Sequence, residues 1–461
     1  MYTFSNKLKS VAFGLMIIGF IGVAYGFFTS NKDFAQVETL LASESHHGEG
    51  HETSSAVGHG EKVDDSYAEE AQVQVLNHSA DDGHGHAEVD DHTKHVNHVM
   101  HAMHKRPWAA LYVAAFFFFM ISLGVLAFYA VQFAAQAGWS PLLLRVMEGI
   151  TAYMMPGALI VLGIAIASGV IGHYGIFIWM DPDVVAHDAL IQGKSAWLNL
   201  TWFGIRGLIF ISGWYAYRFF ARKYSLAQDE AEDNKNFIKT FRISAAFLVF
   251  FLYTESMMSW DWIMSVDPHW FSTLFGWYVL AGMMVSGITV ISMVTIYLKS
   301  KGLLPKVNDS HIHDLAKFMF GFSIFWTYLW FSQFMLIWYS NIPEEVTYFV
   351  TRFQDYLVPF LGMVAMNFVF PLLVLMNSDY KRIPWFVIMA GVVILCGHYI
   401  DVYVMIMPAT VGDQWYIGIP EIFSMLFFAG LFIYIVFTSL TKHPLEPKRN
   451  PFIKESENFH Y

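Results

Sequence analysis

Residues 108–136 read WAALYVAAFFFFMISLGVLAFYAVQFAAQ and contain no charged side chain. An α-helix needs about 20 apolar residues to cross the hydrocarbon core of a bilayer, so this stretch predicts a transmembrane helix. The rest of the chain has the same character, because hydrophobic residues make up 56% of its 461 residues and charged residues only 14%. So few charges cannot cover a water-soluble surface of this size. The sequence therefore predicts an all-α, multi-pass integral membrane protein.

Ten stretches of the sequence are long and apolar enough to cross a bilayer as helices. The first follows Lys7 and Lys9 and so also has features of a signal peptide. Its apolar run is long for a signal peptide, and we expect a retained helix over 1–28. The ten predicted spans are 11–28, 108–136, 144–168, 196–219, 240–264, 273–298, 313–339, 354–376, 384–407 and 420–440.

The basic residues predict the orientation of these helices, because Lys and Arg concentrate in cytoplasmic segments. Nineteen of the 27 Lys and Arg residues fall in one set of alternate connections, which includes both ends of the chain. The opposite set holds seven, five of them spread over 29–107, and Arg206 lies within a predicted helix. We therefore expect both termini in the cytoplasm and the segment 29–107 on the outer side of the membrane.

The segment 29–107 differs from the rest, because it holds twelve of the 20 histidines among Asp, Glu, Gly and Ser. This composition buries too little apolar surface to fold alone, and it predicts an outer loop that is disordered or bound to a partner. Weak binding of zinc, copper or nickel by the imidazoles is the alternative. No spacing there defines a closed tetrahedral site. The best local candidates for metal ligands are His98, His101 and His104, which are spaced to share a helical face.

Two charged residues lie deep inside neighbouring predicted helices, where an unpaired charge is costly. Arg206 lies about ten residues into the span 196–219, and Glu255 about nine residues before the outer end of 240–264. At 1.5 Å per residue both lie roughly 14 Å below the outer edge, so we expect an Arg206–Glu255 ion pair. Such a pair either fixes the register of the two helices or serves as a station on a proton path.

Two further pairs stand three residues apart, a spacing that places both side chains on one face of a helix. His398 and Asp401 form the first pair. A carboxylate beside an imidazole suits a proton relay, and a structural hydrogen bond is the alternative. Arg145 and Glu148 form the second, for which a simple ion pair is the plainer interpretation. Glu148 is also the carboxylate that an inner half-channel would use.

The sequence also limits the chemistry that this chain can perform. Its single cysteine, Cys396, excludes an internal disulfide, a thiolate-held iron–sulfur cluster and a CxxCH haem attachment. Two haems b would need paired histidines inside the membrane, where the sequence offers His398 and, marginally, His173. The chain has no glycine-rich phosphate loop and no basic stripe for nucleic acid. The remaining titratable groups of the outer connections, some of which are expected to be ordinary solvated residues, are Asp181, Asp183, His187, Asp188, Asp261, Asp267 and His269.

One stretch resembles a known family. Residues 259–276 read SWDWIMSVDPHWFSTLFG. This run resembles the signature of the NrfD-like (polysulfide-reductase-type) membrane subunits of alternative complex III, a bacterial quinol:cytochrome c or quinol:oxidase oxidoreductase. The ten spans, the long outer segment after the first of them and the cytoplasmic termini are similar to the F-type of its two large membrane subunits. The resemblance covers about 108–440 and leaves out the His-rich segment.

The resemblance implies two four-helix bundles, made by helices 2–5 (108–265) and 6–9 (266–408). The first helix and the tenth, which with its basic tail occupies 409–461, would flank them. It implies the bacterial inner membrane, a periplasmic His-rich loop, and partners that carry c-type haems and iron–sulfur clusters, with a haem–copper oxidase as a further possible partner. In this family the sister subunit is the better-supported quinol site, and the F-type subunit is discussed as a proton-translocating unit. The residues that would suit these roles are Glu148, Arg206, Glu255, His398 and Asp401 for a proton path, and His173 and Asp261 for an outer end facing quinol or a partner.

Two other functions fit parts of the sequence. A proton-coupled or metal-ion secondary transporter would explain a His-rich outer loop, but such transporters usually show internal repeats with broken helices, and no clear repeat is present here. A passive scaffold that anchors haem-bearing partners would need no proton path. Mutating the buried charges separates the scaffold from the proton-translocating subunit.

Overall fold

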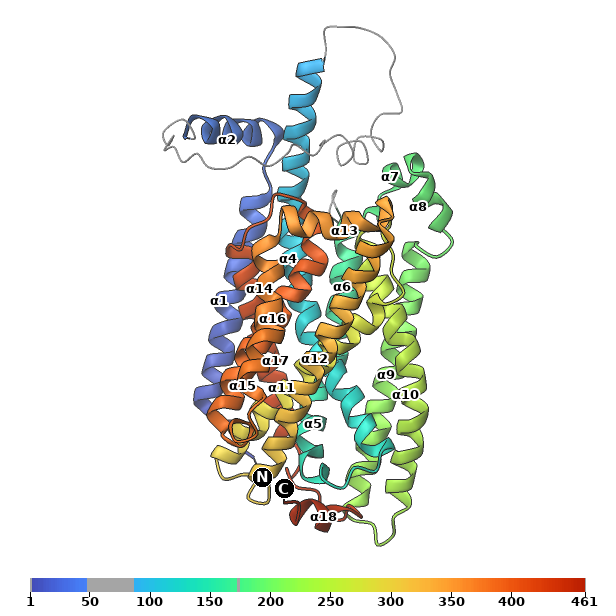
Figure 1. The fold of residues 1–461 in the computed structure, drawn as a ribbon, viewed down its shortest axis with the longest axis vertical. Helices are drawn as coiled ribbons and strands as arrows, with labels where there is room; N and C mark the ends of the chain where they lie inside the picture. Colours follow the sequence, from blue (N-terminus) through green and yellow to red (C-terminus); the bar gives the residue numbers. More distant parts are fainter. Residues whose placement is uncertain (1, 48–86, 172–174, 461) are drawn as a thin grey trace.

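The computed structural model describes residues 2–47, 87–171 and 175–460, and every regular element in these residues is a helix. Figure 1 shows an elongated bundle with both chain termini at one end, which we call the termini end. The opposite end, which we call the α2 end, carries the helix α2 and the projecting beginning of α4. The predicted all-helical fold is confirmed.

The long helices run between these two ends. They are α1 (Asn6–Ser30), α4 (Ala87–Ala134), α6 (Met154–Val170), α9 (Leu200–Gln228), α10 (Lys235–Trp262), α11 (Phe275–Ser300), α12 (Asp309–Ser340), α14 (Leu357–Val364) with α15 (Phe370–Leu375), α16 (Pro384–Val411) and α17 (Ile419–Leu440). Shorter helices lie at the two ends of the bundle. They are α2 (Phe34–His47), α5 (Leu144–Ile150), α7 (Pro182–His187), α8 (Ala189–Lys194), α13 (Pro343–Gln354) and α18 (Ile453–Glu457).

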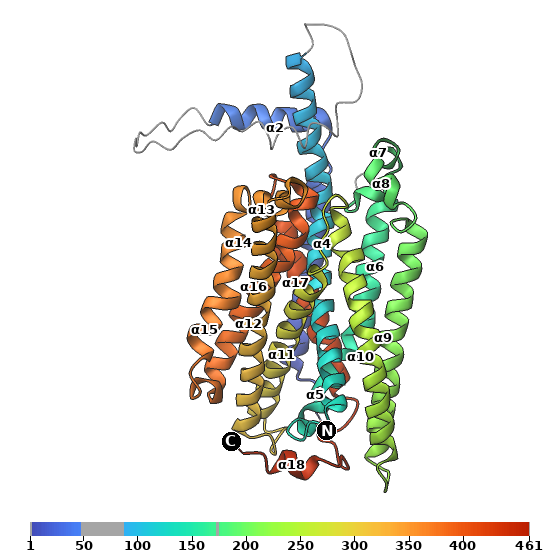
Figure 2. The ribbon, with the colours of Figure 1, turned by 45° about the vertical axis from the view of Figure 1, so that its right-hand side comes forward.

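Within the described residues, nine helices are long and apolar enough to cross a membrane. They match nine of the ten predicted spans. The remaining span, 196–219, is helical as α9 but is not among the nine; its apolar run is interrupted by Arg206. With 29 residues it is as long as α10, which has 28, and Figure 2 shows the two helices side by side. A multi-pass membrane protein is thus supported, and α9 as a tenth span stays a prediction.

Helix α4 lies at the centre of the molecule. It packs against α6 and α10 on one side, α11 and α16 on another, and α17 on a third, and its apolar side chains are almost all buried. Close approach to α11 depends on Gly124, where a Cβ atom would lie 2.2 Å from the Met283 carbonyl oxygen. Small residues at helix contacts of this kind allow backbones to pack closely in membranes.

Two of the spans are interrupted near a proline. Pro156 has no N–H for the carbonyl of Ala152, and a 3₁₀ turn (Thr151–Tyr153) separates α5 from α6 at this position. Pro371 likewise leaves the carbonyl of Asn367 without its helical donor, and a π-helical turn (Ala365–Val369) joins α14 to α15. The second interruption matters for the site described below, because it positions Asn367.

The described parts of the segment 29–107, which are 29–47 and 87–107, are mostly helical. Helix α2 packs through Val37 onto Val96 and Val99 of α4, and Met100 and Met103 cover this contact. These α4 residues recur every three or four positions and so form one apolar stripe between histidines. The overall composition of the segment, on which the prediction was based, does not reveal this stripe. The rest of the segment, residues 48–86, lies outside the described residues.

The C-terminal segment after α17 crosses the termini end and contacts both parts of the bundle. The Lys448 backbone N–H donates to Asp229 (2.9 Å), and Ser456 Oγ donates to the Trp139 carbonyl (2.7 Å). On the other side, Lys306 Nζ lies 2.7 Å from Glu457 Oε1. The tail therefore joins the ends of helices that are far apart in sequence.

A buried ion pair joins α4 to the start of α17 at the α2 end. Arg106 donates through Nε and Nη2 to the two carboxylate oxygens of Glu421, each at 2.8 Å, and its guanidinium lies 3.1 Å from the centre of the Tyr416 ring. The Arg106 and Glu421 side chains are only 7% and 2% exposed. The two-point geometry is the strong form of an arginine–carboxylate bond.

We predict that Arg106→Met alone, or Glu421→Met alone, destabilises the protein by about 3–5 kcal/mol, because each leaves one buried charge without a partner. The double variant should recover most of this loss, because it removes both charges and keeps the volume. Thermal unfolding of the detergent-purified variants measures the effect. A double variant no more stable than the singles would show that the pair does not join these helices.

Candidate functional site

Besides the Arg106–Glu421 pair, buried ionisable residues of the bundle gather in several places, and we consider three of these as the candidate site. The α2-end cluster comprises Arg206, Asp261 and Trp197. The His–Asp cluster comprises His398, Asp401, Tyr278 and Trp326. The termini-end cluster comprises Arg145, Glu148 and Asp229. Residue Glu255 lies apart from all three.

In the α2-end cluster, Arg206 pairs with Asp261 and not with Glu255, so the predicted Arg206–Glu255 pair is wrong. Arg206 Nε donates to Asp261 Oδ2 at 2.6 Å, and Nη1 donates to the Trp197 carbonyl at 2.9 Å. The guanidinium also stacks over the Trp197 ring, 4.1 Å from its centre. Trp197 Nε1 donates to the other oxygen of Asp261 at 2.9 Å, so both carboxylate oxygens are hydrogen-bonded.

The direction of the side chains explains this choice of partner. In a helix each Cα–Cβ bond tilts toward the helix N-terminus. Helix α9 begins at the α2 end and α10 begins at the termini end, so Arg206 points toward the α2 end and Glu255 points away from it. The similar depth predicted for the two residues in the membrane therefore does not bring their side chains together. Asp261, one residue before the end of α10, lies where the arginine reaches.

Glu255 is consequently a buried carboxyl without a cationic partner among the described residues. Its side chain is almost completely buried, with the residue 1% exposed, and Oε1 has no hydrogen-bond partner. An isolated carboxylate in such surroundings costs many kcal/mol, so the side chain is expected to carry its proton. On the same helix, Thr254 Oγ1 accepts a hydrogen bond from Trp214 Nε1 at 3.0 Å.

The His–Asp cluster confirms the pairing of His398 with Asp401. Asp401 Oδ2 lies 3.3 Å from His398 Nδ1 and accepts the Trp326 Nε1–H at 2.9 Å. The Tyr278 hydroxyl donates to Asp401 Oδ1. His398 and Asp401 are at most 1% exposed, and His398 Nε2 has no partner in the described residues. An Nδ1–H tautomer bonded to Asp401 would leave the Nε2 lone pair available for a proton.

The π-helical turn between α14 and α15 closes this cluster. It carries Asn367, whose Nδ2 lies 3.5 Å from His398 Nδ1. A glycine is required opposite, because a Cβ atom on Gly397 would lie 2.1 Å from Asn367 Oδ1. Single π turns are frequent at functional positions in helices. Asn367 was not predicted as a site residue, and the indication of its π turn in the sequence is Pro371, four residues later.

The termini-end cluster confirms the Arg145–Glu148 pair and adds a partner that the sequence did not suggest. Arg145 Nη1 donates to Glu148 at 2.9 Å, and Nη2 donates to Asp229 at 2.6 Å. The other oxygen of Glu148 accepts bonds from Tyr129 at 3.1 Å and Ser225 at 2.6 Å. Glu148 is therefore fully hydrogen-bonded, in contrast to Glu255.

The weak metal candidates are not assembled into a site. Among residues 2–47, 87–171 and 175–460, no group of three His, Cys, Asp or Glu side chains is placed to hold a metal ion. His98 lies 3.4 Å from Asp413, and His104 Nε2 lies 2.9 Å from the Lys32 carbonyl, with His101 between them on α4. His173 lies outside the described residues.

In the loop between α6 and α9, two acidic residues begin short helices. Asp181 caps α7, and Asp188 caps α8 by accepting the N–H groups of Leu190 and Ile191. Asp188 also lies 2.6 Å from His269 Nε2, in the stretch 259–276. Partial burial alone would raise the pKa of the Asp188 carboxyl, but the Ile191 and Leu190 N–H groups and the His269 imidazole outweigh burial and lower this pKa.

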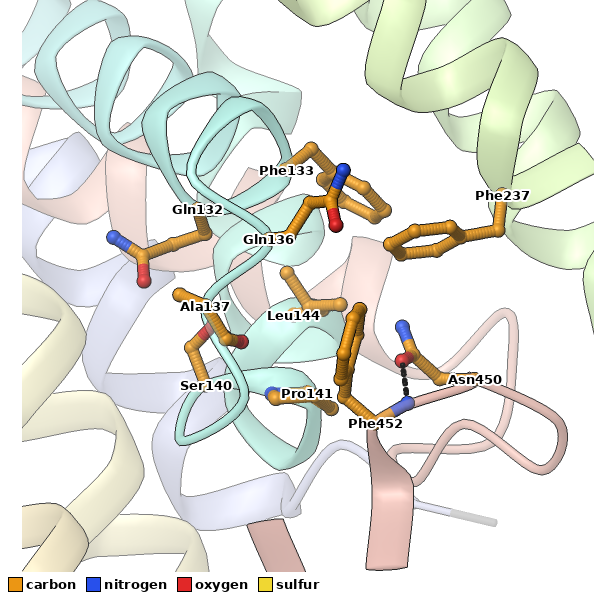
Figure 3. Close-up of a pocket in the computed structure, with 10 residues that line it drawn as sticks. All are labelled: Gln132, Phe133, Gln136, Ala137, Ser140, Pro141, Leu144, Phe237, Asn450 and Phe452. Atoms are coloured by element: carbon orange, nitrogen blue, oxygen red, sulfur yellow. Dashed lines mark hydrogen bonds between the residues drawn. The ribbon is translucent and has the colours of Figure 1, made fainter. Parts of the chain in front are cut away.

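Two cavities lie near these clusters, and both are small. One, with about 270 Å³ of unfilled space, is lined by Tyr278 of the His–Asp cluster, by Gln333 and by Trp330. The Gln333 Oε1 and Trp330 Nε1 atoms have no partner in the described residues. The other, about 200 Å³, lies at the termini end, where Phe133, Phe237 and Phe452 meet (Figure 3). These volumes include space open to solvent, and little of it is enclosed, so both cavities suit water better than a quinol ring.

Comparison with known proteins does not identify this chain. No protein-family model and no curated protein matches it. The candidate site is therefore defined by the geometry above, and the resemblance of residues 259–276 to a known family stays a prediction.

A double-mutant cycle tests the partner of Arg206. We predict a coupling of about 1–3 kcal/mol between Arg206→Met and Asp261→Asn, because the two side chains share a buried hydrogen-bonded pair. The cycle between Arg206→Met and Glu255→Gln serves as the matched control and should give less than about 0.5 kcal/mol. The measurement is the free energy of unfolding of each variant. Stronger coupling to Glu255 than to Asp261 would contradict the assignment.

A second prediction concerns the cap at Asp188. Asp188→Ala should weaken α8 by about 0.5–2 kcal/mol, and the amides of 189–199 should exchange hydrogen faster. Asp188→Asn should cost less, because Asn also caps helices. Because the pKa of Asp188 is lowered in the folded state, its contribution is complete at neutral pH and is lost as the pH falls through that value. Equal exchange in all three proteins at neutral pH would rule out the cap.

Proposed function

We propose that this chain is a membrane subunit of a respiratory quinol:cytochrome c or quinol:oxidase oxidoreductase of the alternative complex III type. In this proposal it acts as a scaffold and as a proton path beside a quinol-oxidising sister subunit. The single observation that carries the proton path is Glu255, a buried carboxyl inside a membrane helix with no charged partner in the described residues. Ionisable residues in such positions usually mark a pathway for ions or protons.

The contrast with the other buried carboxylates supports this choice. Asp261, Glu421 and Glu148 each contact an arginine, so their charge is compensated and their role is accounted for by structure. Glu255 contributes no such bond. Retaining a carboxyl there costs stability, which is the pattern expected of a residue that exchanges a proton during function.

The His–Asp cluster supplies a second proton-exchanging group in the other part of the bundle. Asp401 accepts hydrogen bonds from Tyr278 and Trp326, and His398 Nε2 has no partner in the described residues. The neighbouring cavity lined by Tyr278 and Gln333 offers space for water beside this cluster. Water held between unpartnered polar groups is a usual part of buried polar networks.

An apolar section separates Glu255 from the polar groups nearer the termini end. Along α10, the ten helical steps from Thr254 to Ser244 span about 15 Å, and Phe247 and Phe251 are buried within this interval. Beyond it, Ser244 is hydrogen-bonded to Tyr217 at 2.7 Å. In the proposal this section is the gate, and protons cross it only when water enters or side chains move.

The same proposal includes the arrangement of the helices in two four-helix bundles and their orientation in the membrane. The packing of α4 with α6 and α10, and of α9 with α10, supports a first four-helix bundle. The packing of α11 with α12 and α16, and of α14 with α16, supports a second, with the paired α1 and α17 beside them. The basic segments at the termini end support a cytoplasmic location for both termini in a bacterial inner membrane, with the α2 end in the periplasm.

Partners would supply the redox cofactors in this proposal. The chain's single cysteine cannot hold an iron–sulfur cluster, and the small cavities do not suit a quinol ring. Iron–sulfur and c-type haem subunits at the α2 end, together with the sister subunit, would oxidise the quinol. The metal-transporter alternative has no metal-ligand group to support it in the described residues.

The proposal predicts that Glu255→Gln lowers the number of protons translocated per electron, because the amide fills the same space but cannot exchange a proton. Quinol oxidation and assembly should be largely unchanged, since no ion pair is broken. Proton release from proteoliposomes during quinol oxidation provides the measurement. The matched control is Glu344→Gln on the exposed part of α13, which should behave as wild type. Normal assembly with an unaltered proton ratio in Glu255→Gln would exclude the path.

A further inference from the structure

Positive charge gathers at the termini end between α9 and α17. Arg218 and Arg222 lie four residues apart on one face of α9, and Lys442 and His443 follow the end of α17. Arg218 Nε donates to Thr151 Oγ1 at 3.1 Å, and Arg222 Nη1 donates to Ser439 Oγ at 3.2 Å. Each arginine thus reaches a hydroxyl group of a neighbouring element. We call these four basic side chains, with Thr151 and Ser439, the basic cluster.

The nearest carboxylates do not compensate this charge. Glu148 and Asp229 face the same region, and both are bound to Arg145. These three side chains together carry one net negative charge, which offsets only part of the positive charge of the basic cluster. Counting Arg145, Arg218 and Arg222 against these two carboxylates leaves one positive charge, and Lys442 adds another. Consistent with this excess, burial together with Arg222 and Arg145 lowers the pKa of His443.

An exposed apolar stripe begins at the basic cluster and runs toward the α2 end. Met155 and Leu159 follow Thr151 at intervals of four residues, so the three lie on one face of the helix. Their exposed fractions are 36% for Met155 and 42% for Leu159. Farther along, α6 and α9 are in contact, because a Cβ atom on Gly207 would lie 3.0 Å from Leu162. The stripe therefore occupies the part of α6 nearest the arginines.

We infer that the basic cluster binds the phosphate of an anionic phospholipid, with an acyl chain lying along Met155 and Leu159. Arginine suits this role, because its fork of N–H donors matches phosphate oxygens. The Ser439 hydroxyl, which accepts from Arg222, can donate a further hydrogen bond to the same oxygens, whereas the Thr151 hydroxyl already donates to the Glu148 carbonyl. The termini end is the cytoplasmic side in our proposal, where basic residues between helices meet lipid head groups. This inference does not depend on quinol oxidation or on proton movement.

The lipid would also join elements that pack mainly on other helices. Helix α9 packs mainly on α6 and α10, whereas α17 packs mainly on α1 and α4. A phosphate between Arg218 and Arg222 would add to the Arg222–Ser439 hydrogen bond in holding these two elements together. The expected consequence is a protein that is more stable in membranes containing anionic lipid.

The test reconstitutes the purified full-length chain into nanodiscs of phosphatidylcholine, with or without phosphatidylglycerol. Native mass spectrometry then counts the retained phosphatidylglycerol, and thermal unfolding gives the midpoint. We expect wild type to retain phosphatidylglycerol and to unfold at a higher temperature in its presence. Each Arg→Gln change at Arg218 or Arg222 should weaken retention about fivefold, since one basic side chain near a membrane surface contributes about 1 kcal/mol.

Three controls keep the outcome specific. Lys223→Gln removes an exposed charge from the same helix and should retain lipid as wild type does. Arg222→Lys keeps the charge and should retain more lipid than Arg222→Gln. Inorganic phosphate separates a lipid site from a free-anion site, and it should not raise the unfolding midpoint in phosphatidylcholine alone. Equal lipid retention by the Arg218→Gln/Arg222→Gln variant and by wild type, or equal stabilisation by inorganic phosphate, would overturn the inference.

Discussion

Burying a charge away from water costs several kcal/mol unless a partner compensates it, and the arrangement of this protein depends on how that cost is met. Arg106 bonds Glu421, Arg206 bonds Asp261, and Arg145 bonds both Glu148 and Asp229. Each pair joins elements distant in sequence or fixes a helix end. With these charges compensated, α4 can lie buried at the centre with the other helices packed around it.

The exceptions to this compensation direct attention to function. Glu255 has no cation, and His398 presents an unpartnered nitrogen beside Asp401, so each can exchange a proton without breaking an ion pair. Phe247 and Phe251 separate Glu255 from the termini end, as a proton gate requires. The charges of Arg218 and Arg222 are compensated differently in our inference, by the phosphate of a bound lipid. Compensation by the protein, by a proton and by a lipid thus accounts for these residues, whereas buried Arg352 donates to the backbone carbonyls of Tyr348 and Val404.

Local patterns predicted some of this and tertiary geometry decided the rest. His398–Asp401 and Arg145–Glu148 were predictable because a spacing of three residues fixes proximity within one helix. The partner of Arg206 was mistaken because depth alone ignores the direction of side chains on antiparallel helices. Arg106 and Glu421 are 315 positions apart, and no local signal connects them. The contact of α2 with α4 was hidden because a few valines were outweighed by the surrounding histidines.

In our proposal this chain works as a subunit among redox partners and holds no redox cofactor itself. The most direct test is to purify the tagged protein from its native membrane in a mild detergent and record a visible spectrum with a subunit inventory. The account predicts a c-type haem spectrum and iron–sulfur and multihaem subunits at fixed stoichiometry. A colourless preparation containing only this chain would contradict it.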